Sequence, residues 1–312
     1  MPQDPGQDPV GVRGLPGPPR AGADEPSELG PGVRERHLLV RGLPWRYLEG
    51  GDGEPLLFLH GGGAMGQTWC GAFPLLARRH RVLLPDLPGF GATPPDPGLE
   101  ALPDVVTRLT EFLPAAGFAP GVVLGNSLGG YLAAALALRE PAWFRALVLL
   151  APAGFGPDRR EGDPLSYPLP GAMNRVLFHH PARVAGCFPR MGPEEASRRA
   201  RNARETTRTW VARGFPPLPL PRLRAPVLLL WGNEDQILPV TAAPQVRDRL
   251  RQAELKVLED CGHVPTWEAP VRVASEVEGF LARLGPGPGT TSPPGYPSPM
   301  GPPVRREQET GT

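Results

Sequence analysis

A serine flanked by glycines is the residue in this chain whose setting most clearly points to chemistry. The segment Gly125-Asn126-Ser127-Leu128-Gly129 lies where an apolar run meets an Ala- and Leu-rich stretch. A strand that turns so tightly into a helix needs neighbours without side chains, because a Cβ would clash with the approaching helix. The hydroxyl of Ser127 is then exposed for nucleophilic attack. The N–H of Leu128, at the start of the helix, is placed to stabilise an oxyanion.

A glycine-rich loop nearer the N-terminus offers a second oxyanion donor. The run His60-Gly61-Gly62-Gly63 follows the apolar segment 57–59. Because this loop lacks side chains, one of its backbone N–H groups can closely approach a substrate oxygen. We predict Gly62 as the donor, with Gly61 as the alternative, and we expect His60 to shape the loop by hydrogen bonding.

A carboxylate and a histidine follow two later strands. Asp235 comes directly after the buried strand expected at 227–231, and His263 comes after the strand expected at 255–259. We predict that His263 is the general base for the serine proton and that Asp235 holds its imidazole in the required tautomer. Glu234, beside Asp235, is the alternative acid.

The elements that must position these groups alternate between strands and helices. The residue patterns predict an antiparallel strand pair within 33–48, further strands at 80–86 and 146–150, and helices at 102–116 and 128–139. The 146–150 strand is fully apolar, as expected inside a parallel sheet that is covered on both faces. The sequence therefore predicts an α/β fold.

The chain reads as one domain with two Pro- and Gly-rich tails. We predict that residues 1–34 and 286–312 are disordered, because they have too little apolar surface to offset the entropy of ordering. The domain is then 35–285. Within it, the segment at about 155–222 differs in composition, because it mixes Pro and Gly with short amphipathic pieces. The pieces expected within it are 172–178, 181–188 and 194–211.

This set of motifs resembles the α/β-hydrolase superfamily over about residues 37 to 285. The order Ser127, Asp235, His263 is the order of that superfamily, and the segment 86–91 looks like its loop near the mouth of the site. The resemblance implies a mostly parallel eight-stranded sheet flanked by helices, with 155–222 as an inserted helical cap. It also implies catalysis without a cofactor.

Within the superfamily, the motifs look most similar to hydrolases that cleave carbon–carbon bonds in products of aromatic ring opening. Those enzymes pair His-Gly-Gly-Gly with Gly-Asn-Ser-x-Gly-Gly and carry Cys-Gly-His followed by a Trp-Glu pair, here Trp267-Glu268. This chain departs from their pattern at Ala64-Met65 and at Val264, and many esterases and lactonases share the motifs. We therefore expect an ester or lactone hydrolase first and a carbon–carbon hydrolase second. A perhydrolase or acyltransferase comes third, followed by a non-catalytic ligand-binding protein.

The cap and the elbow supply the candidate substrate contacts. An apolar pocket would draw on aromatic and other apolar residues of the cap and on residues around the serine, while a cap arginine would bind a substrate carboxylate. The candidates for substrate contact are Asn126, Gly61, Trp267, Phe178 and Trp210, with Met173, Leu177, Phe188 and Met191 as further cap residues. The arginine candidates are Arg175, Arg183 and Arg190.

Cysteines and histidines give no pattern of a cofactor or metal protein. Three cysteines, Cys70, Cys187 and Cys261, do not make a disulfide framework, so a reducing cytoplasm is the simplest setting. We interpret Cys261 as a packed thiol. His179 and His180 are adjacent and the set lacks a close ligand spacing, so we predict no metal.

Charge and hydropathy restrict the partners to small molecules. The formal net charge is +1 at pH 7, which gives no case for nucleic-acid binding. The N-terminus has no basic start followed by an apolar run, and no stretch approaches the roughly 20 apolar residues of a membrane span. The sequence says nothing of oligomeric state.

Overall fold

The computed structural model describes residues 32–62, 70–155, 176–187 and 191–287. Its centre is an 8-stranded sheet with the strand order β1-β2-β4-β3-β5-β6-β7-β8. The expected α/β fold with an eight-stranded sheet is confirmed. The strands are β1 (Val33–Val40), β2 (Leu43–Gly50), β3 (Glu54–Leu59), β4 (His80–Pro85), β5 (Gly121–Asn126), β6 (Phe144–Leu150), β7 (Val227–Gly232) and β8 (Ala253–Leu258).

The sheet is antiparallel at one edge and parallel elsewhere. Strands β1 and β2 form a hairpin whose turn residues, Arg41 and Gly42, both have positive φ, as a tight two-residue turn requires. Strand β2 also pairs antiparallel with β4, and every later pair in the sheet is parallel. The predicted antiparallel pair within 33–48 is therefore confirmed, and the carboxyl ends of the parallel strands meet at one edge.

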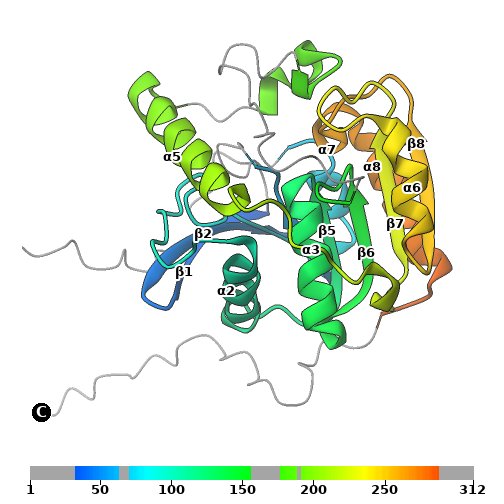
Figure 1. The fold of residues 1–312 in the computed structure, drawn as a ribbon, viewed down its shortest axis with the longest axis horizontal. Coiled ribbons are helices and arrows are strands. Elements are labelled where there is room, and N and C mark those ends of the chain that lie inside the picture. Colours follow the sequence, from blue (N-terminus) through cyan, green and yellow to red (C-terminus); the bar gives the residue numbers. More distant parts are fainter. Residues whose placement is uncertain (1–31, 63–69, 156–175, 188–190, 288–312) are drawn as a thin grey trace, which may run out of the picture.

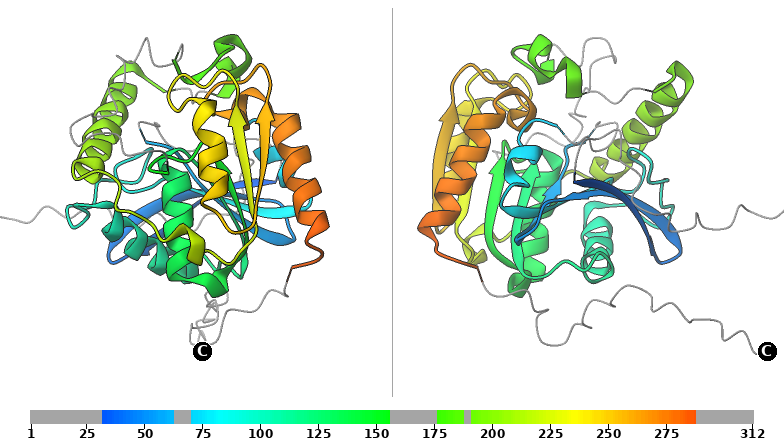
Figure 2. Two further views of the ribbon diagram at one scale, coloured as in Figure 1. Left: turned by 45° about the vertical axis from the view of Figure 1, so that its right-hand side comes forward. Right: turned by 180° about the vertical axis from the view of Figure 1, so that it is seen from behind.

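Alternating strand residues feed two separate cores. Along β3, Leu57 and Leu59 pack into the core beneath α2 and α3, whereas Leu56 and Phe58 pack on the other face beneath α1 and α8. Figure 1 shows α2 and α3 on the near face, and the view from behind in Figure 2 shows α8 on the far face. The α-helices described in the two layers and at the site edge are α1 (Phe73–Leu76), α2 (Leu102–Ala115), α3 (Leu128–Arg139), α6 (Ala243–Asp248), α7 (Pro265–Glu268) and α8 (Pro270–Arg283).

After β6 the chain leaves the sheet and enters the segment for which we predicted a cap. Its described parts are the 3₁₀ helix η2 (Pro181–Cys187) and the helix α5 (Pro193–Val211), which lie on the side of the sheet where β5 and β6 end (Figure 1). The predicted piece at 172–178 falls mostly outside the described residues, as do Met173, Arg175, Phe188 and Arg190. The 3₁₀ helices η1 (Pro141–Trp143), η3 (Leu220–Arg222) and η4 (Val240–Ala242) complete the connections between the described strands and helices.

The first strand lies close to the N-terminal limit of the described residues. Strand β1 begins at Val33, two residues before the predicted boundary at 35. The predicted disorder of the two tails concerns residues that lie outside the described part, apart from the few next to the boundaries. Among the helices that the structure describes, none has the length and apolar character needed to cross a bilayer.

The cysteines correct the sequence-based expectation. Cys70 and Cys187 form a disulfide, with Cα atoms 5.5 Å apart and a sequence separation of 117. The expectation of no disulfide is wrong because the pairing depends on where η2 lies against the loop before α1, which spacing does not reveal. Cys261 is a free, buried thiol, as predicted.

Candidate active site

Ser127 lies in a strained turn between β5 and α3. Its backbone has φ 55° and ψ −117°, a conformation that non-glycine residues rarely adopt. A Cβ on Gly129 would lie 1.9 Å from the Leu59 carbonyl oxygen, and a Cβ on Gly125 would lie 2.2 Å from the Gly129 oxygen. The Ser127 N–H donates to the Leu150 carbonyl at 2.9 Å, which anchors the turn to β6. The two glycines are therefore sterically required, as the motif predicted.

His263 and Asp235 form a buried pair at the same edge of the sheet. The distance between His263 Nδ1 and Asp235 Oδ2 is 2.7 Å, and the two side chains are 4% and 0% exposed. The other oxygen of Asp235, Oδ1, accepts from the N–H groups of Ile237 and Leu238 at 2.8 Å each. Because Nδ1 faces the carboxylate, the tautomer assigned from this network carries its proton there and leaves Nε2 as the basic nitrogen. Glu234, the alternative acid, is exposed.

Asn126 joins the serine turn to the histidine loop. Its side-chain nitrogen donates to the carbonyl oxygens of Leu150 and His263, each at 3.0 Å, and the residue is 4% exposed. The hydrogen bond to His263 joins two residues that are 137 positions apart in sequence. The side chain that we predicted as a substrate contact therefore faces two backbone carbonyls in this structure.

The two residues predicted as oxyanion donors belong to the start of α3 and to the glycine loop. Leu128 is the first residue of α3, where helix N–H groups have no partner within the helix. A Cβ on Gly61 would lie 3.3 Å from the Ser127 Cβ, so the glycine loop passes close to Ser127. Gly62 is the last described residue of that loop, and Gly63 lies outside the described residues.

His60 fixes the start of the glycine loop, as expected. Its Nδ1 lies 2.8 Å from the Gly61 carbonyl, and its Nε2 lies 3.1 Å from the Leu87 nitrogen. Since the Leu87 N–H is a donor, Nε2 accepts and Nδ1 donates, which is the neutral imidazole. Burial lowers the pKa of His60 and favours the same form. His60 therefore has a structural role, because its two ring nitrogens hydrogen-bond the glycine loop and the Leu87 backbone.

Glu268 is a buried carboxylate whose role we did not predict. Its Oε2 accepts from the Gly262 N–H at 2.7 Å, and its Oε1 accepts from the His180 N–H. One carboxylate thus connects the residue before His263 to the cap segment. A second link runs beside it, because the His263 N–H donates to the Leu177 carbonyl at 2.7 Å. The Trp-Glu pair marked this position in the sequence, but nothing in the sequence indicated its two backbone partners.

The predicted aromatic contacts fall into two separate ring pairs. Phe178 stacks on Trp267 with centroids 6.0 Å apart and planes 9° apart. Trp210, on α5, packs against Phe90 at 5.6 Å. Phe178 and Trp210 are 3% and 2% exposed, so both are part of the packing between cap and core.

Cys261 is not placed to act as a nucleophile. Burial is the main cause that raises the pKa of its thiol to about 12. The thiol therefore stays protonated at neutral pH, while the thiolate is the reactive form. The interpretation of Cys261 as a packed residue agrees with this environment.

The fold and the placement of these loops define a hydrolase class. The chain belongs to the alpha/beta hydrolase family, which matches over residues 56–276. The expected superfamily is thereby confirmed, and with it the coarse assignment of the protein as a hydrolase.

The similar proteins include a dienoic acid hydrolase, an esterase and a phospholipase. The 2-hydroxy-6-oxo-6-(2'-aminophenyl)hexa-2,4-dienoic acid hydrolase of Metapseudomonas resinovorans is 28% identical over 268 residues, covering 80% of this chain and 91% of its own. The pimeloyl-[acyl-carrier protein] methyl ester esterase of Aeromonas hydrophila is 30% identical, covering 74% and 96%. Among solved structures, a bacterial membrane phospholipase A superposes with a TM-score of 0.68 at 29% identity, covering 81% of this chain and 87% of that chain.

Proposed function

We propose that this protein is a serine hydrolase that cleaves a small carboxylic ester or lactone through an acyl-enzyme. The observation that carries the proposal is the buried His263–Asp235 pair, tied through Asn126 to the strained turn of Ser127. A positive φ at a non-glycine residue costs stability, and such strained residues cluster at functional sites. The strain at Ser127 is therefore typical of a residue held in place for function. The esterase among the similar proteins supports the ester substrate.

The proposed reaction has two balanced halves. The Ser127 oxygen attacks the substrate carbonyl carbon while its proton passes to His263 Nε2. The N–H groups of Leu128 and Gly62 stabilise the oxyanion that forms. When the carbon–oxygen bond breaks, the leaving alkoxide takes the proton from the imidazolium. Water then attacks the acyl-serine with His263 again as base, which releases the acid and restores the serine.

A carbon–carbon hydrolase is the second candidate, because the similar proteins include hydrolases named for a 2-hydroxy-6-oxo-dienoic acid and for 2-hydroxymuconate semialdehyde. Such a dienoate substrate has a carboxylate that needs a cationic partner. Of the three cap arginines that we proposed for this role, Arg183 is the one in the described residues. It donates to Asp260 Oδ2 at 2.8 Å and so is engaged by a protein carboxylate. This contact favours the ester substrate.

Active-site labelling tests the proposal directly. Wild-type protein should react with a fluorophosphonate probe and hydrolyse short p-nitrophenyl esters. Ser127→Ala should lose labelling and lose turnover by at least about 10⁴-fold. Ser197→Ala, an exposed serine on α5, is the matched control and should behave as wild type. Labelling of Ser127→Ala at the wild-type rate would contradict the assignment.

The remaining candidates are outcomes of the same experiment. Labelling of the wild type without ester turnover would favour the carbon–carbon substrates. Turnover that rises sharply with added peroxide or alcohol would favour a perhydrolase or acyltransferase, because both use the same acyl-enzyme. No labelling of the folded wild type would favour a ligand-binding protein. The cytoplasmic location stays a prediction, and the Cys70–Cys187 disulfide is more typical of an oxidising compartment.

A further inference from the structure

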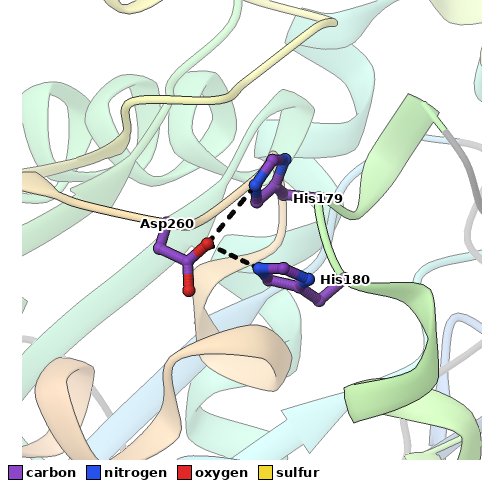
Figure 3. A group of neighbouring side chains, drawn as sticks. All are labelled: His179, His180 and Asp260. Carbon is purple, nitrogen blue, oxygen red and sulfur yellow. Dashed lines mark hydrogen bonds and ion pairs between the residues drawn. The ribbon is translucent and has the colours of Figure 1, made fainter.

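Two adjacent histidines of the cap meet one carboxylate of the histidine loop at the molecular surface. His180 Nε2 lies 2.5 Å from Asp260 Oδ1, and His179 Nε2 lies 3.3 Å from the same oxygen. Figure 3 shows both imidazoles directed at that oxygen from the cap side. The three ligand atoms all lie within 4.8 Å of one another. Within the described residues, this arrangement of imidazoles and a carboxylate is separate from the Asp235–His263 pair.

The local backbone holds both rings on one side. Consecutive side chains on an extended segment point to opposite faces, so two neighbouring histidines rarely share a partner. Here the chain bends at His179 and His180, and the buried Glu268 carboxylate accepts the His180 N–H at the bend. Asp260 has φ 56°, a left-handed conformation that few non-glycine residues adopt. Two irregular backbones thus bring these three side chains together.

We propose that His179, His180 and Asp260 bind one divalent transition-metal ion of the Zn²⁺ class, with water completing the coordination. Two imidazole nitrogens and one carboxylate oxygen form a donor set that suits Zn²⁺. Ligands about 2.0 to 2.1 Å from a tetrahedral ion lie about 3.3 Å from one another. The His179–Asp260 distance of 3.3 Å already has this value, whereas His180 has to move outward by rotation of its exposed side chain.

Arg183 both orients the carboxylate and limits the affinity. Its guanidinium donates to Asp260 Oδ2 at 2.8 Å, which fixes the carboxylate and leaves Oδ1 directed at the histidines. Such an outer hydrogen bond to a ligating carboxylate is common in metal sites. The arginine charge opposes a cation, so we expect micromolar rather than nanomolar affinity.

An ion at this site would connect the cap to the loop that carries His263. The two histidines belong to the cap segment that continues into η2, and Asp260 is three residues before His263. Metal coordination would therefore resist separation of the cap from the core at this point. Because bound ligand stabilises the folded state, Zn²⁺ should also raise the Tm.

A competition titration on untagged protein tests the site. The protein is treated with a chelator, freed of it, and titrated at pH 7.5 with Zn²⁺ against a chromogenic competitor. We expect one ion per wild-type chain, binding weakened at least about tenfold in His179→Gln/His180→Gln, and a Zn²⁺-dependent rise in Tm only where the ion binds. His37→Gln, an exposed histidine on β1, is the matched control and should bind as wild type.

Three results would overturn the proposal. The first is wild-type protein that takes up less than half an ion per chain at 100 μM Zn²⁺. The second is undiminished binding in the folded double variant. The third is binding lost in His263→Gln but kept in the double variant, which would place the ion on the buried pair. If the double variant does not fold, Asp260→Asn takes its place, because it removes a charge without removing volume. Its Zn²⁺ binding is then compared with that of the wild type in the same way.

Discussion

Asp260 and His263 lie three residues apart on the loop after β8, each in a histidine–carboxylate pair, and the two pairs differ in almost every physical respect. The His263–Asp235 pair is buried, and its carboxylate also accepts two backbone N–H groups. The His180–Asp260 pair is exposed, and its carboxylate also binds an arginine and faces a second histidine. Residue types alone do not separate these pairs, but burial and the other hydrogen-bond partners do.

The comparison teaches what burial adds. An exposed ion pair contributes little to stability, because water and salt screen it and its side chains lose entropy. A buried pair braced by backbone donors keeps one geometry and one tautomer, which general-base chemistry needs. The buried His263–Asp235 pair is suited to hold a proton at a defined atom. The exposed His180–Asp260 pair is suited to give up its hydrogen bond for another ligand.

The largest expected effect is on the buried pair. Asp235→Asn keeps the oxygen that accepts from Ile237 and Leu238 but can place an amide against His263 Nδ1, which favours the wrong tautomer. We expect kcat for the best ester to fall about 10⁴-fold, or about 5 kcal/mol in the barrier, with the Tm nearly unchanged. Steady-state kinetics measure this. Glu234→Gln is the control, and a large loss there with an active Asp235→Asn would reverse the assignment of the acid.

The disulfide gives the next effect, on stability rather than chemistry. Cys70→Ser/Cys187→Ser should lower the free energy of unfolding by about 2 to 5 kcal/mol, because the unfolded chain is no longer cross-linked. Urea denaturation with and without a reducing agent measures it. The reductant should destabilise the wild type and leave the double variant unchanged. Equal sensitivity in both proteins would mean that this cross-link is not the cause.

Substitution of Glu268 should have an intermediate effect, on both stability and activity. Its carboxylate accepts hydrogen bonds from the Gly262 and His180 N–H groups and so joins the loops that carry the two pairs. Glu268→Gln removes the charge and presents an amide group to one of two buried N–H donors. We expect a loss of about 1 to 3 kcal/mol in the free energy of unfolding. We also expect kcat to fall more than KM changes, because the bracing acts through His263. Glu276→Gln, on α8, is the control. Loss of stability with unchanged kcat would make Glu268 purely structural.

The smallest effect concerns the exposed pair and its pH dependence. The pKa of Asp260 is lowered from 3.8 to about 2, first by the His180 hydrogen bond and then by Arg183. A carboxyl whose pKa is lower in the folded state stabilises the protein above its unfolded pKa. The stability advantage of wild type over Asp260→Asn should therefore persist from pH 7 to about 4 and shrink between pH 4 and 2. Urea denaturation across this range checks it, with Asp248→Asn as a surface control. A difference that grows below pH 4 would have the wrong sign.

The candidate site could be predicted because each of its three groups lies at or shortly after the end of a predicted strand. Ser127, Asp235 and His263 come after β5, β7 and β8, and parallel strands bring their carboxyl ends to one edge. The need for glycine on both sides of Ser127 could also be predicted, because a Cβ at either position would clash with nearby backbone.

What the sequence did not reveal depends on where the cap lies. The Cys70–Cys187 pairing, the two backbone partners of Glu268 and the approach of the histidines to Asp260 all join segments far apart in the chain. No periodicity or spacing records such contacts, because they follow from tertiary packing. Asn126 illustrates the same limit, since its partner carbonyl on His263 is 137 residues away.

The disulfide also has a topological consequence. It closes a covalent ring from Cys70 to Cys187 that contains Ser127, while Asp235 and His263 lie outside the ring. A protease that cuts one bond inside the ring leaves a single covalent molecule. One cut between Cys187 and Asp235 instead leaves Ser127 on one fragment and Asp235 and His263 on the other, and the two fragments stay together only as long as the fold does.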